Sequence, residues 1–570
     1  MLRSSARTLA TAARSDPKPL FDASYDVVVV GSGAAGLTAA VTAAKKHGLK
    51  VLVTEKAKYF GGTTAFSGGG AWLPNNHHQH TLGVTDSKEK ATTYLRGVVG
   101  SRYDNRTINS FLDNAPRMAK WIDDNTALKF FALPLPDYYT SLDGAAQGRT
   151  LVASPFDGRR LGGRLKDIRY ALQGFKAFES MQIAFDEAPI MANPLASTIN
   201  LAYVVAKLQR YMLDLLRYGK GSLLANGNAI VGSLVYTIAQ SGGDLWNNSP
   251  ATELVTNGGR VEGVVVAKDG GEIRVRATKG VLLASGGFGR AKEARAFVPH
   301  EYCLSPSSVT GDGIRLAQAA GAILPDPSPD NAIYSPVSIL QPRHGPIRMY
   351  PHFGYDRAKP GSIVVDTNGQ RFINESVGYH QFVQHMHAAK MTRCFMIADK
   401  RFLCKYGIGF ALADPYPKGK ILSQNYLISA KTIPQLAAKL GIPEDNLVQT
   451  VKRCNENAAR GKDPDFGRGD SVYDHVFGDP TNKPNASLGT CDQAPFYAVR
   501  MYPGNVSTQY GLRTDEYVRV MGPEGKPIDG LYAAGNDSNS VWRGTYPAGG
   551  SSIGPAMTFG YVAAEHMASN

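Results

Sequence analysis

The sequence predicts an α/β protein in which a dinucleotide-binding domain of the Rossmann type carries an inserted α+β domain. Three segments support this fold class: a strand, glycine turn, helix and strand at 25–55, a strand-rich block at 251–289, and a C-terminal segment at 501–570 with a final helical stretch. Because 570 residues exceed what one compact core usually holds, we expect segments that are distant in sequence to share a domain.

We expect four parts along the chain. Residues 1–22 would be a flexible N-terminus or a targeting segment, and 23–300 the nucleotide-binding domain, with an insertion at about 159–240. Residues 301–500 would form the inserted domain, which caps the substrate and supplies catalytic residues, and 501–570 would return to the nucleotide-binding domain.

Residues 25–55 follow the order of one βαβ unit, from the apolar run YDVVVV through the turn GSGAAG and a helical stretch to LKVLVTEK. The turn places Gly31, Gly33 and Gly36 in the spacing GxGxxG. It needs glycine for its backbone angles, for close approach of a pyrophosphate and for tight helix packing. Glu55 ends the second strand, where a carboxylate can accept hydrogen bonds from an adenosine ribose. The unit therefore predicts a dinucleotide site.

Two further glycine clusters extend this site: GGTTAFSGGG from Gly61 and ASGGFG from Ala284. A flavin dinucleotide is held along its length by several backbone loops, so the clusters favour FAD over NAD. The prediction becomes a Rossmann-type FAD-binding domain with an inserted α+β catalytic domain. The residues expected to contact FAD are Gly31, Ser32, Gly33, Ala34, Ala35, Gly36, Glu55, Lys56, Gly61, Gly62, Thr63, Thr64, Ser67, Gly68, Gly69, Ala284, Gly286, Gly287, Gly535, Asn536, Gly550, Ser552 and Ile553.

The remaining segments alternate in character. Helical periodicity at 90–135 precedes a polar, basic stretch at 138–180, and apolar spacing of 3 and 4 predicts a helix within 190–216. Alternation at period 2 around two turn signals predicts a hairpin in 251–289 that returns to the core.

The insertion joins basic residues to an apolar stretch. Arg159, Arg160, Arg164, Lys166 and Arg169 precede the apolar segments in sequence. This combination predicts contact with a membrane surface or with a bulky apolar substrate.

Composition excludes several classes of protein. The net charge is +14, but the basic residues are scattered without a recognition motif, so we expect no nucleic-acid partner. The cysteines lack CxxC spacing, which argues against a disulfide framework or a zinc site and favours a reducing compartment. They are Cys303, Cys394, Cys404, Cys454 and Cys491. The sequence contains no apolar run of about 18 residues, so it predicts no membrane-spanning helix.

The first fifteen residues contain Arg3, Arg7 and Arg14 and no acidic residue. This composition is typical of a transit peptide, and a plain disordered terminus explains it equally well. We expect the protein in the cytoplasm or at the membrane periphery, with mitochondrial targeting as an alternative.

His77, His78 and His80 lie in a polar loop. No cysteine or carboxylate near them in the sequence completes a set of metal ligands. We therefore expect solvated side chains and no metal site.

Four longer motifs give the chain from Tyr25 onward a more specific resemblance. They are DYY at 137–139, PGSIVVDTNGQRFINES from Pro360, DPDFGRGDSVYD from Asp463 and GLYAAGNDSNSVWRGTYPAGGSSIGPAMTFG from Gly530. With them the chain resembles the FAD-dependent 3-ketosteroid Δ1-dehydrogenases, within the fumarate reductase flavoprotein superfamily. The resemblance implies 1,2-dehydrogenation of a 3-ketosteroid, with hydride transfer to the flavin and reoxidation by a quinone or another acceptor. The SHT motif of covalent-flavin members is absent, which implies noncovalent FAD.

The resemblance also implies roles for individual residues. The base that closes the family motif NESAPY is Tyr379, since this chain reads NESVGY. A tyrosine hydrogen-bonded to the base is Tyr138 or Tyr139. The family pattern TYPGAG reads TYPAGG here, which assigns binding of the substrate carbonyl to Tyr546 and the backbone N–H of Gly550. Because free tyrosine has a pKa near 10, the site must lower the pKa of the base or couple its proton to a neighbour.

Other functions stay open on the sequence alone. A Δ4(5α)-dehydrogenase of 3-ketosteroids shares the tyrosine motif and differs in its product. A fumarate reductase needs several basic residues to clamp a dicarboxylate, and the C-terminal segment offers only Arg543. A non-enzymatic alternative is a membrane-associated, flavin-binding electron-transfer module.

Overall fold

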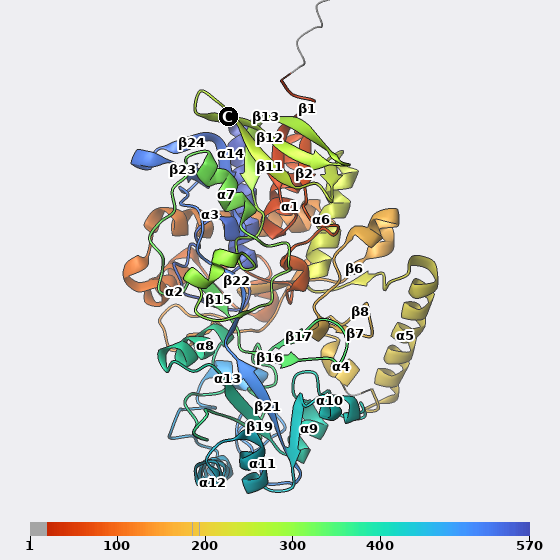
Figure 1. Ribbon diagram of the computed structural model, residues 1–570, viewed down its shortest axis with the longest axis vertical. Coiled ribbons are helices and arrows are strands. Elements are labelled where there is room, and N and C mark those ends of the chain that lie inside the picture. The colour runs from red at the N-terminus through yellow and green to blue at the C-terminus, as the bar shows by residue number, and fades with distance from the viewer. Residues whose placement is uncertain (1–19, 185, 193) are drawn as a thin grey trace, which may run out of the picture.

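The computed structural model describes residues 20–184, 186–192 and 194–570 (Figure 1). Nearly all of the N-terminal segment, and with it the targeting hypothesis, lies outside these residues. Among the residues that the structure describes, no helix combines the length and the apolar character that crossing a membrane requires.

The predicted βαβ unit is present as β1 (Ala23–Val30), α1 (Ala34–Val41) and β2 (Val51–Thr54). β1 lies between β2 and β13 (Gly271–Leu283) and runs parallel to both. Its valines are fully buried because the sheet is covered on both faces, which explains the uninterrupted apolar run in the sequence.

One large mixed sheet organises the nucleotide-binding domain. Its main path is β10 (Asp244–Trp246), β2, β1, β13, β12 (Arg260–Lys268) and β11 (Ala251–Asn257), with β24 (Pro527–Ala533) paired to β13 and β23 (Arg519–Met521) paired to β24. The predicted strand block is confirmed, because β11, β12 and β13 are successive antiparallel strands and β13 then reaches the core beside β1. α14 (Ile553–Ser569) packs on α1, so the C-terminal segment returns as predicted. The predicted α/β fold is thus confirmed.

A second sheet lies at the opposite end of the molecule (Figure 1). Its path is β17 (Arg348–Pro351), β16 (Val337–Leu340), β21 (Phe496–Tyr502), β19 (Cys394–Ala398) and β18 (Ser362–Val365), and β20 (Leu427–Ala430) also pairs with β21. The helices of this part are α8 (Tyr379–Ala388), α9 (Lys400–Tyr406), α10 (Gly419–Ser423), α11 (Ile433–Leu440), α12 (Glu444–Arg460) and α13 (Val472–Phe477). The exact domain boundaries remain a prediction.

The two parts meet through a small sheet. β22 (Gly504–Thr508) pairs with β14 (Tyr302–Cys303) and β15 (Ala332–Tyr334). α7 (Asp312–Ala319), although inside the range expected for the catalytic domain, buries Ile314 in the core of the large sheet.

The helical periodicity at 90–135 corresponds to α2 (Lys88–Val99) and α3 (Asn105–Asn125). β3 (Gly70–Trp72), β5 (Thr150–Ala153) and β4 (Phe130–Ala132) form a sheet beside them. The helix expected within 190–216 is α5 (Thr198–Tyr218), on the right-hand edge of Figure 1, whereas α6 (Gly227–Gln240) is buried against α1. The short elements of the insertion are β6 (Phe156–Asp157), a 3₁₀ segment (Gly158–Asp167), β7 (Lys176–Ala177), β8 (Met181–Gln182), α4 (Ala188–Ala192) and β9 (Leu223–Leu224).

Candidate active site

The glycine turn after β1 has the geometry that a pyrophosphate requires. A Cβ on Gly31 would lie 2.3 Å from the Ala284 carbonyl oxygen, and one on Gly36 would lie 2.2 Å from the Gly31 carbonyl oxygen, so these two glycines permit close backbone packing. A Cβ on Gly33 would meet only the Thr64 hydroxyl, at 3.6 Å. Gly33 therefore faces open space at the start of α1, where backbone N–H groups can bind an anion.

The other glycine clusters complete the cradle. Gly62 has a φ of +48°, and nothing lies within 4 Å of where its Cβ would be. The adjacent Thr63 hydroxyl is buried with no hydrogen-bond partner among the described residues, which fits a site built for a polar ligand. Gly535, Asn536 and Ser552 line one cavity together at the start of α14. The residues present thus fit a bound FAD.

Glu55 is held at the end of β2 by its neighbours. One carboxylate oxygen accepts hydrogen bonds from the Ser32 N–H and hydroxyl, and the other accepts one from the Ala57 N–H at 2.8 Å. The oxygen that bonds the Ala57 N–H has a second lone pair for a ribose hydroxyl. Lys56 turns away, because its ammonium group bonds Asp312 and Thr310.

Sequence reasoning missed Asp537, which ties two of the predicted clusters together. Its carboxylate is fully buried and accepts hydrogen bonds from the N–H groups of Ser285 and Gly287. Burial raises the pKa of this carboxyl group. The local sequence does not reveal that this aspartate is buried and bonded, because its partners lie about 250 positions away in the sequence.

Tyrosines from four separate segments meet between the two parts of the protein. The Tyr379 hydroxyl, on the first residue of α8, donates a hydrogen bond to the Tyr546 hydroxyl at 2.9 Å. The Tyr138 ring lies 5.9 Å from the Tyr379 ring and 6.0 Å from the Tyr546 ring, between centroids. The Tyr473 ring of α13 packs on Tyr138 at 5.0 Å.

The structure places Tyr138 in this cluster and Tyr139 outside it. The Tyr138 N–H donates to the Pro547 carbonyl at 3.1 Å, which turns its ring toward Tyr379. The ring contacts Gly378, whose lack of a side chain leaves the space that the ring occupies. The Tyr139 ring makes no such contact with the cluster, and its N–H donates to the Tyr94 hydroxyl at 3.4 Å.

Burial raises the pKa of Tyr379, Tyr138 and Tyr546. Tyr379 could act as a base through a lowered pKa or by passing its proton to a neighbour. The raised pKa argues against the first of these two ways. A neighbour for that proton is present, because the Tyr138 ring packs against both Tyr379 and Tyr473 and acts to lower the pKa of both. These contacts support transfer of the proton to a neighbour.

A buried guanidinium group lies beside the cluster. Arg357 is fully buried and donates to the carbonyl groups of His352, Glu375 and Val377, which fixes the segment that leads to Tyr379. Its charge acts to lower the pKa of Tyr473, although burial keeps that pKa raised. Arg357 and Tyr473 escaped sequence reasoning because only the fold brings them to Tyr138.

Gly550 lies close to the Tyr546 hydroxyl. The residue has a φ of +91°, and its carbonyl accepts the Trp72 N–H at 3.0 Å. A hydrogen bond from the Gly550 N–H acts to lower the pKa of the Tyr546 hydroxyl. The Tyr546 hydroxyl and the Gly550 N–H lie close together beside the N-terminus of α14, and both can donate to a developing oxyanion.

Aromatic rings line the other side of Tyr379. The Phe353 ring lies 5.0 Å from Tyr379, and Phe175 stacks on Phe353 at 6.3 Å. Phe175 belongs to the insertion, so this insertion reaches the neighbourhood of the tyrosines.

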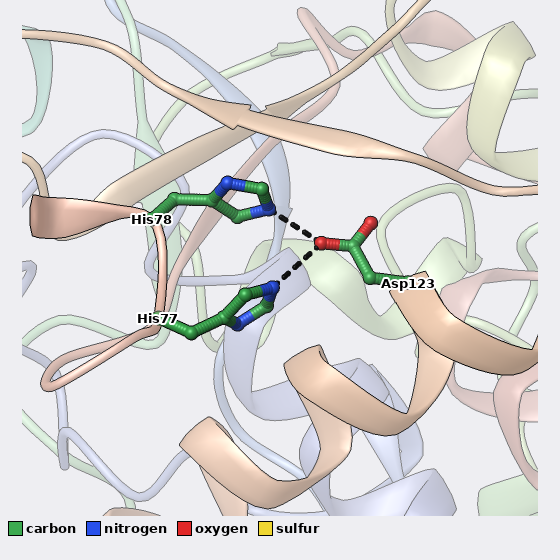
Figure 2. Close-up of side chains that lie close together, drawn as sticks. All are labelled: His77, His78 and Asp123. Atoms are coloured by element: carbon green, nitrogen blue, oxygen red, sulfur yellow. Dashed lines mark hydrogen bonds and ion pairs between the residues drawn. The ribbon is translucent and has the colours of Figure 1, made fainter. Parts of the chain in front are cut away.

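The expectation that the side chains of His77 and His78 are solvated was wrong. Both side chains are partly buried and bond the carboxylate of Asp123, which α3 brings to the loop (Figure 2). Asp123 lies 45 positions from His78, too far for a local reading of the sequence to find. His80 is exposed, as expected.

Comparisons with known proteins identify the family of this chain. A family described as an FAD binding domain matches residues 26–553. A 3-oxosteroid 1-dehydrogenase of Mycobacterium tuberculosis is 36% identical over 95% of this chain and 98% of its own. A 4-oxocyclohex-2-ene-1-carboxylate 5-dehydrogenase of Sinomonas cyclohexanicum is also 36% identical, over 95% of this chain and 93% of its own.

One solved structure is similar over almost the entire length. It is a 3-ketosteroid Δ1-dehydrogenase of Sterolibacterium denitrificans in complex with 1,4-androstadiene-3,17-dione, with a TM-score of 0.87 and 34% identity. The match covers 96% of this chain and 99% of the other. The chain belongs to the FAD-binding flavoprotein family that includes the 3-oxosteroid 1-dehydrogenases, and its cofactor is FAD.

Proposed function

We propose that the protein is an FAD-dependent 3-ketosteroid Δ1-dehydrogenase, which converts a 3-keto-4-ene steroid to the 1,4-diene. One observation carries the proposal. The Tyr379 hydroxyl lies 2.9 Å from the Tyr546 hydroxyl, and the Gly550 N–H lies near that hydroxyl, so a base stands beside two groups that can donate to a carbonyl. Removal of a proton next to a ketone requires this pairing.

The residues act in sequence on the steroid. The 3-keto oxygen accepts hydrogen bonds from the Tyr546 hydroxyl and the Gly550 N–H, which stabilise the enolate and make the protons on carbon 2 more acidic. Tyr379 takes one of these protons, while its own proton passes toward Tyr138 and Tyr473. Bound FAD, held noncovalently, would supply the oxidising group that accepts the hydride from carbon 1. Loss of that hydride would leave a double bond between carbons 1 and 2, and a quinone or another acceptor would then reoxidise the cofactor.

The surroundings of the tyrosines favour an uncharged, bulky substrate over a carboxylate. Arg357, the buried cation beside the cluster, is already bonded to three main-chain carbonyls. Arg543, which a dicarboxylate would need, pairs with Asp104 at 3.2 Å. Phe353 and Phe175 provide apolar contacts instead. These contacts favour a steroid over fumarate or a cyclohexane carboxylate as the substrate.

The insertion supports peripheral attachment to a membrane. The outward face of α5 is apolar, and Ile199, Leu213 and Leu216 expose 79%, 66% and 85% of their surface. Lys207 and Asp214 point inward, where Lys207 pairs with Glu187. A helix with its apolar face in solvent is suited to lie in a lipid interface.

Basic residues of the neighbouring 3₁₀ segment add charge to this part of the surface. Arg159, Arg160, Arg164 and Lys166 are exposed there and would attract anionic lipid. The insertion would then pass sterols from lipid toward Phe175.

The test is an anaerobic screen of flavin bleaching. We expect 4-androstene-3,17-dione to bleach the bound flavin, and NMR of the product to place the new double bond between carbons 1 and 2. Parallel reactions contain a saturated 3-ketosteroid, 4-oxocyclohexanecarboxylate or succinate. Bleaching by a carboxylate alone, or introduction of a 4-ene without a 1-ene, would overturn the proposal.

A further inference from the structure

We propose that His77, His78 and Asp123 form a binding site for a zinc-type divalent cation, separate from the active site. Figure 2 shows both imidazole rings directed at one carboxylate oxygen. His77 Nε2 lies 2.9 Å from Asp123 Oδ2, and His78 Nε2 bonds the same oxygen. One ligand atom from each residue lies within 4.8 Å of the other two.

This spacing suits a single metal ion. Zinc–nitrogen bonds of about 2 Å separate two tetrahedral ligands by about 3.3 Å. The ligand atoms need only small rotations of the side chains to reach that separation. Two imidazoles and one carboxylate leave the fourth tetrahedral position for water, and the nitrogen donors favour zinc over magnesium or calcium, which prefer oxygen ligands.

The carboxylate is held in place for a cation. Asp123 is buried, and its other oxygen, Oδ1, accepts the Phe130 N–H at 2.8 Å. It lies in the last turn of α3, which ends at Asn125, and the C-terminal end of a helix favours positive charge. The nearby Lys120 ammonium is paired with Asp124 at 3.0 Å, which offsets its repulsion of a cation.

The histidine loop is also fixed before any ion binds. The Asn76 amide donates to the carbonyls of Leu73 and Gly148, at 2.8 and 3.0 Å, and its oxygen accepts the His78 N–H at 3.0 Å. A preformed loop reduces the reorganisation that metal binding requires. His77 Nδ1 is buried with no hydrogen-bond partner within the described part of the chain, so Nε2, which faces Asp123, is the nitrogen that a metal would bind.

The ion would stabilise the fold and would not touch the reacting atoms. The histidine loop continues from β3, where the Trp72 N–H bonds the Gly550 carbonyl. A metal that joins this loop to α3 therefore braces the strand behind the proposed carbonyl-binding residue. An ion that binds only the folded state raises the melting temperature.

The experiment uses the full-length holoprotein without a polyhistidine tag. After treatment with a chelator and dialysis against zinc chloride, we expect about one zinc per chain by elemental mass spectrometry, and a higher melting temperature than in magnesium. His78→Ala and Asp123→Asn should lose both effects. The asparagine retains an oxygen for the Phe130 N–H. His80→Ala, which removes the exposed histidine of the same loop, is the matched control and should keep both effects.

FAD content and circular dichroism verify that each variant is folded. Wild-type protein without stoichiometric zinc, or equal zinc in the His78→Ala, Asp123→Asn and wild-type proteins, would overturn the proposal. If either variant fails to fold, anomalous scattering at the zinc edge from soaked wild-type crystals decides. A peak between His77, His78 and Asp123 supports the site, and its absence there contradicts it.

Discussion

The hydroxyl of Tyr379 donates its hydrogen bond to the hydroxyl of Tyr546, at 2.9 Å. When a ketone takes a hydrogen bond from Tyr546, Tyr379 is left beside the carbon next to the carbonyl. No other residue is assigned to that proton. The Tyr379→Phe variant should therefore reduce its flavin about a hundredfold to ten-thousandfold more slowly, while it retains FAD. Stopped-flow bleaching with 4-androstene-3,17-dione measures this, and near wild-type rates would end the assignment of the base.

Tyr546→Phe removes one of the two carbonyl donors and leaves the Gly550 N–H. Loss of one oxyanion donor typically costs on the order of a hundredfold in rate. We expect that slowing in flavin reduction, with a smaller change in steroid affinity because the apolar contacts persist. A change in affinity alone would assign Tyr546 to substrate binding only.

Tyr473→Phe tests the path of the proton. The ring still packs on Tyr138, but the hydroxyl that could receive the proton is gone. Flavin reduction should slow by roughly tenfold at neutral pH and less at high pH, where solvent can accept the proton. A purely structural role would give the same fractional loss at every pH, so the pH profile distinguishes the two. Tyr139→Phe, outside the cluster, is the control.

Sequence patterns can nominate site residues where the chemistry depends on contiguous residues. The turn that begins at Gly31 and the motifs around Tyr379 and Tyr546 are local, so their spacing is visible in the chain. Tyr138 and Tyr139 could not be separated, because a loop has no periodicity that tells which ring faces inward. The carboxylate of Asp123 was missed because long-range packing brings it to its partners. In each missed case the information lies in tertiary contacts.

Stability should fall in mild acid because His380 is buried and neutral. Burial lowers its pKa to about 4, and its Nδ1 accepts the Tyr334 N–H at 3.1 Å, which a protonated ring could not do. Below about pH 6.5 the unfolded chain binds a proton that the folded protein excludes. The free energy of unfolding should thus decrease between pH 6.5 and 4, by up to about 3 kcal/mol for this residue.

Urea denaturation at pH 7.5 and 5 measures that decrease. His380→Gln can accept the hydrogen bond from the Tyr334 N–H without titrating, so the stability of this variant should depend less on pH. His385→Ala, at an exposed position of the same helix, should behave as wild type. If the free energy of unfolding changes equally with pH in the His380→Gln and wild-type proteins, His380 is not the source of the pH dependence.

The exposed leucines of α5 should contribute to membrane binding and little to the stability of the fold. Leu213 and Leu216 are largely exposed, so changing both to glutamine should alter stability by no more than about 0.5 kcal/mol per site. In contact with lipid each leucine would contribute up to about 1.5–3 kcal/mol, so the double variant should bind vesicles at least tenfold more weakly. Co-sedimentation with vesicles that contain anionic phosphatidylglycerol measures this, and binding should also weaken at high salt because of the basic 3₁₀ segment. Val448→Gln, on exposed α12 in the other part of the protein, should leave binding unchanged. If the double variant sediments like the wild type, α5 is not the surface that meets the membrane, and its apolar face needs a different partner.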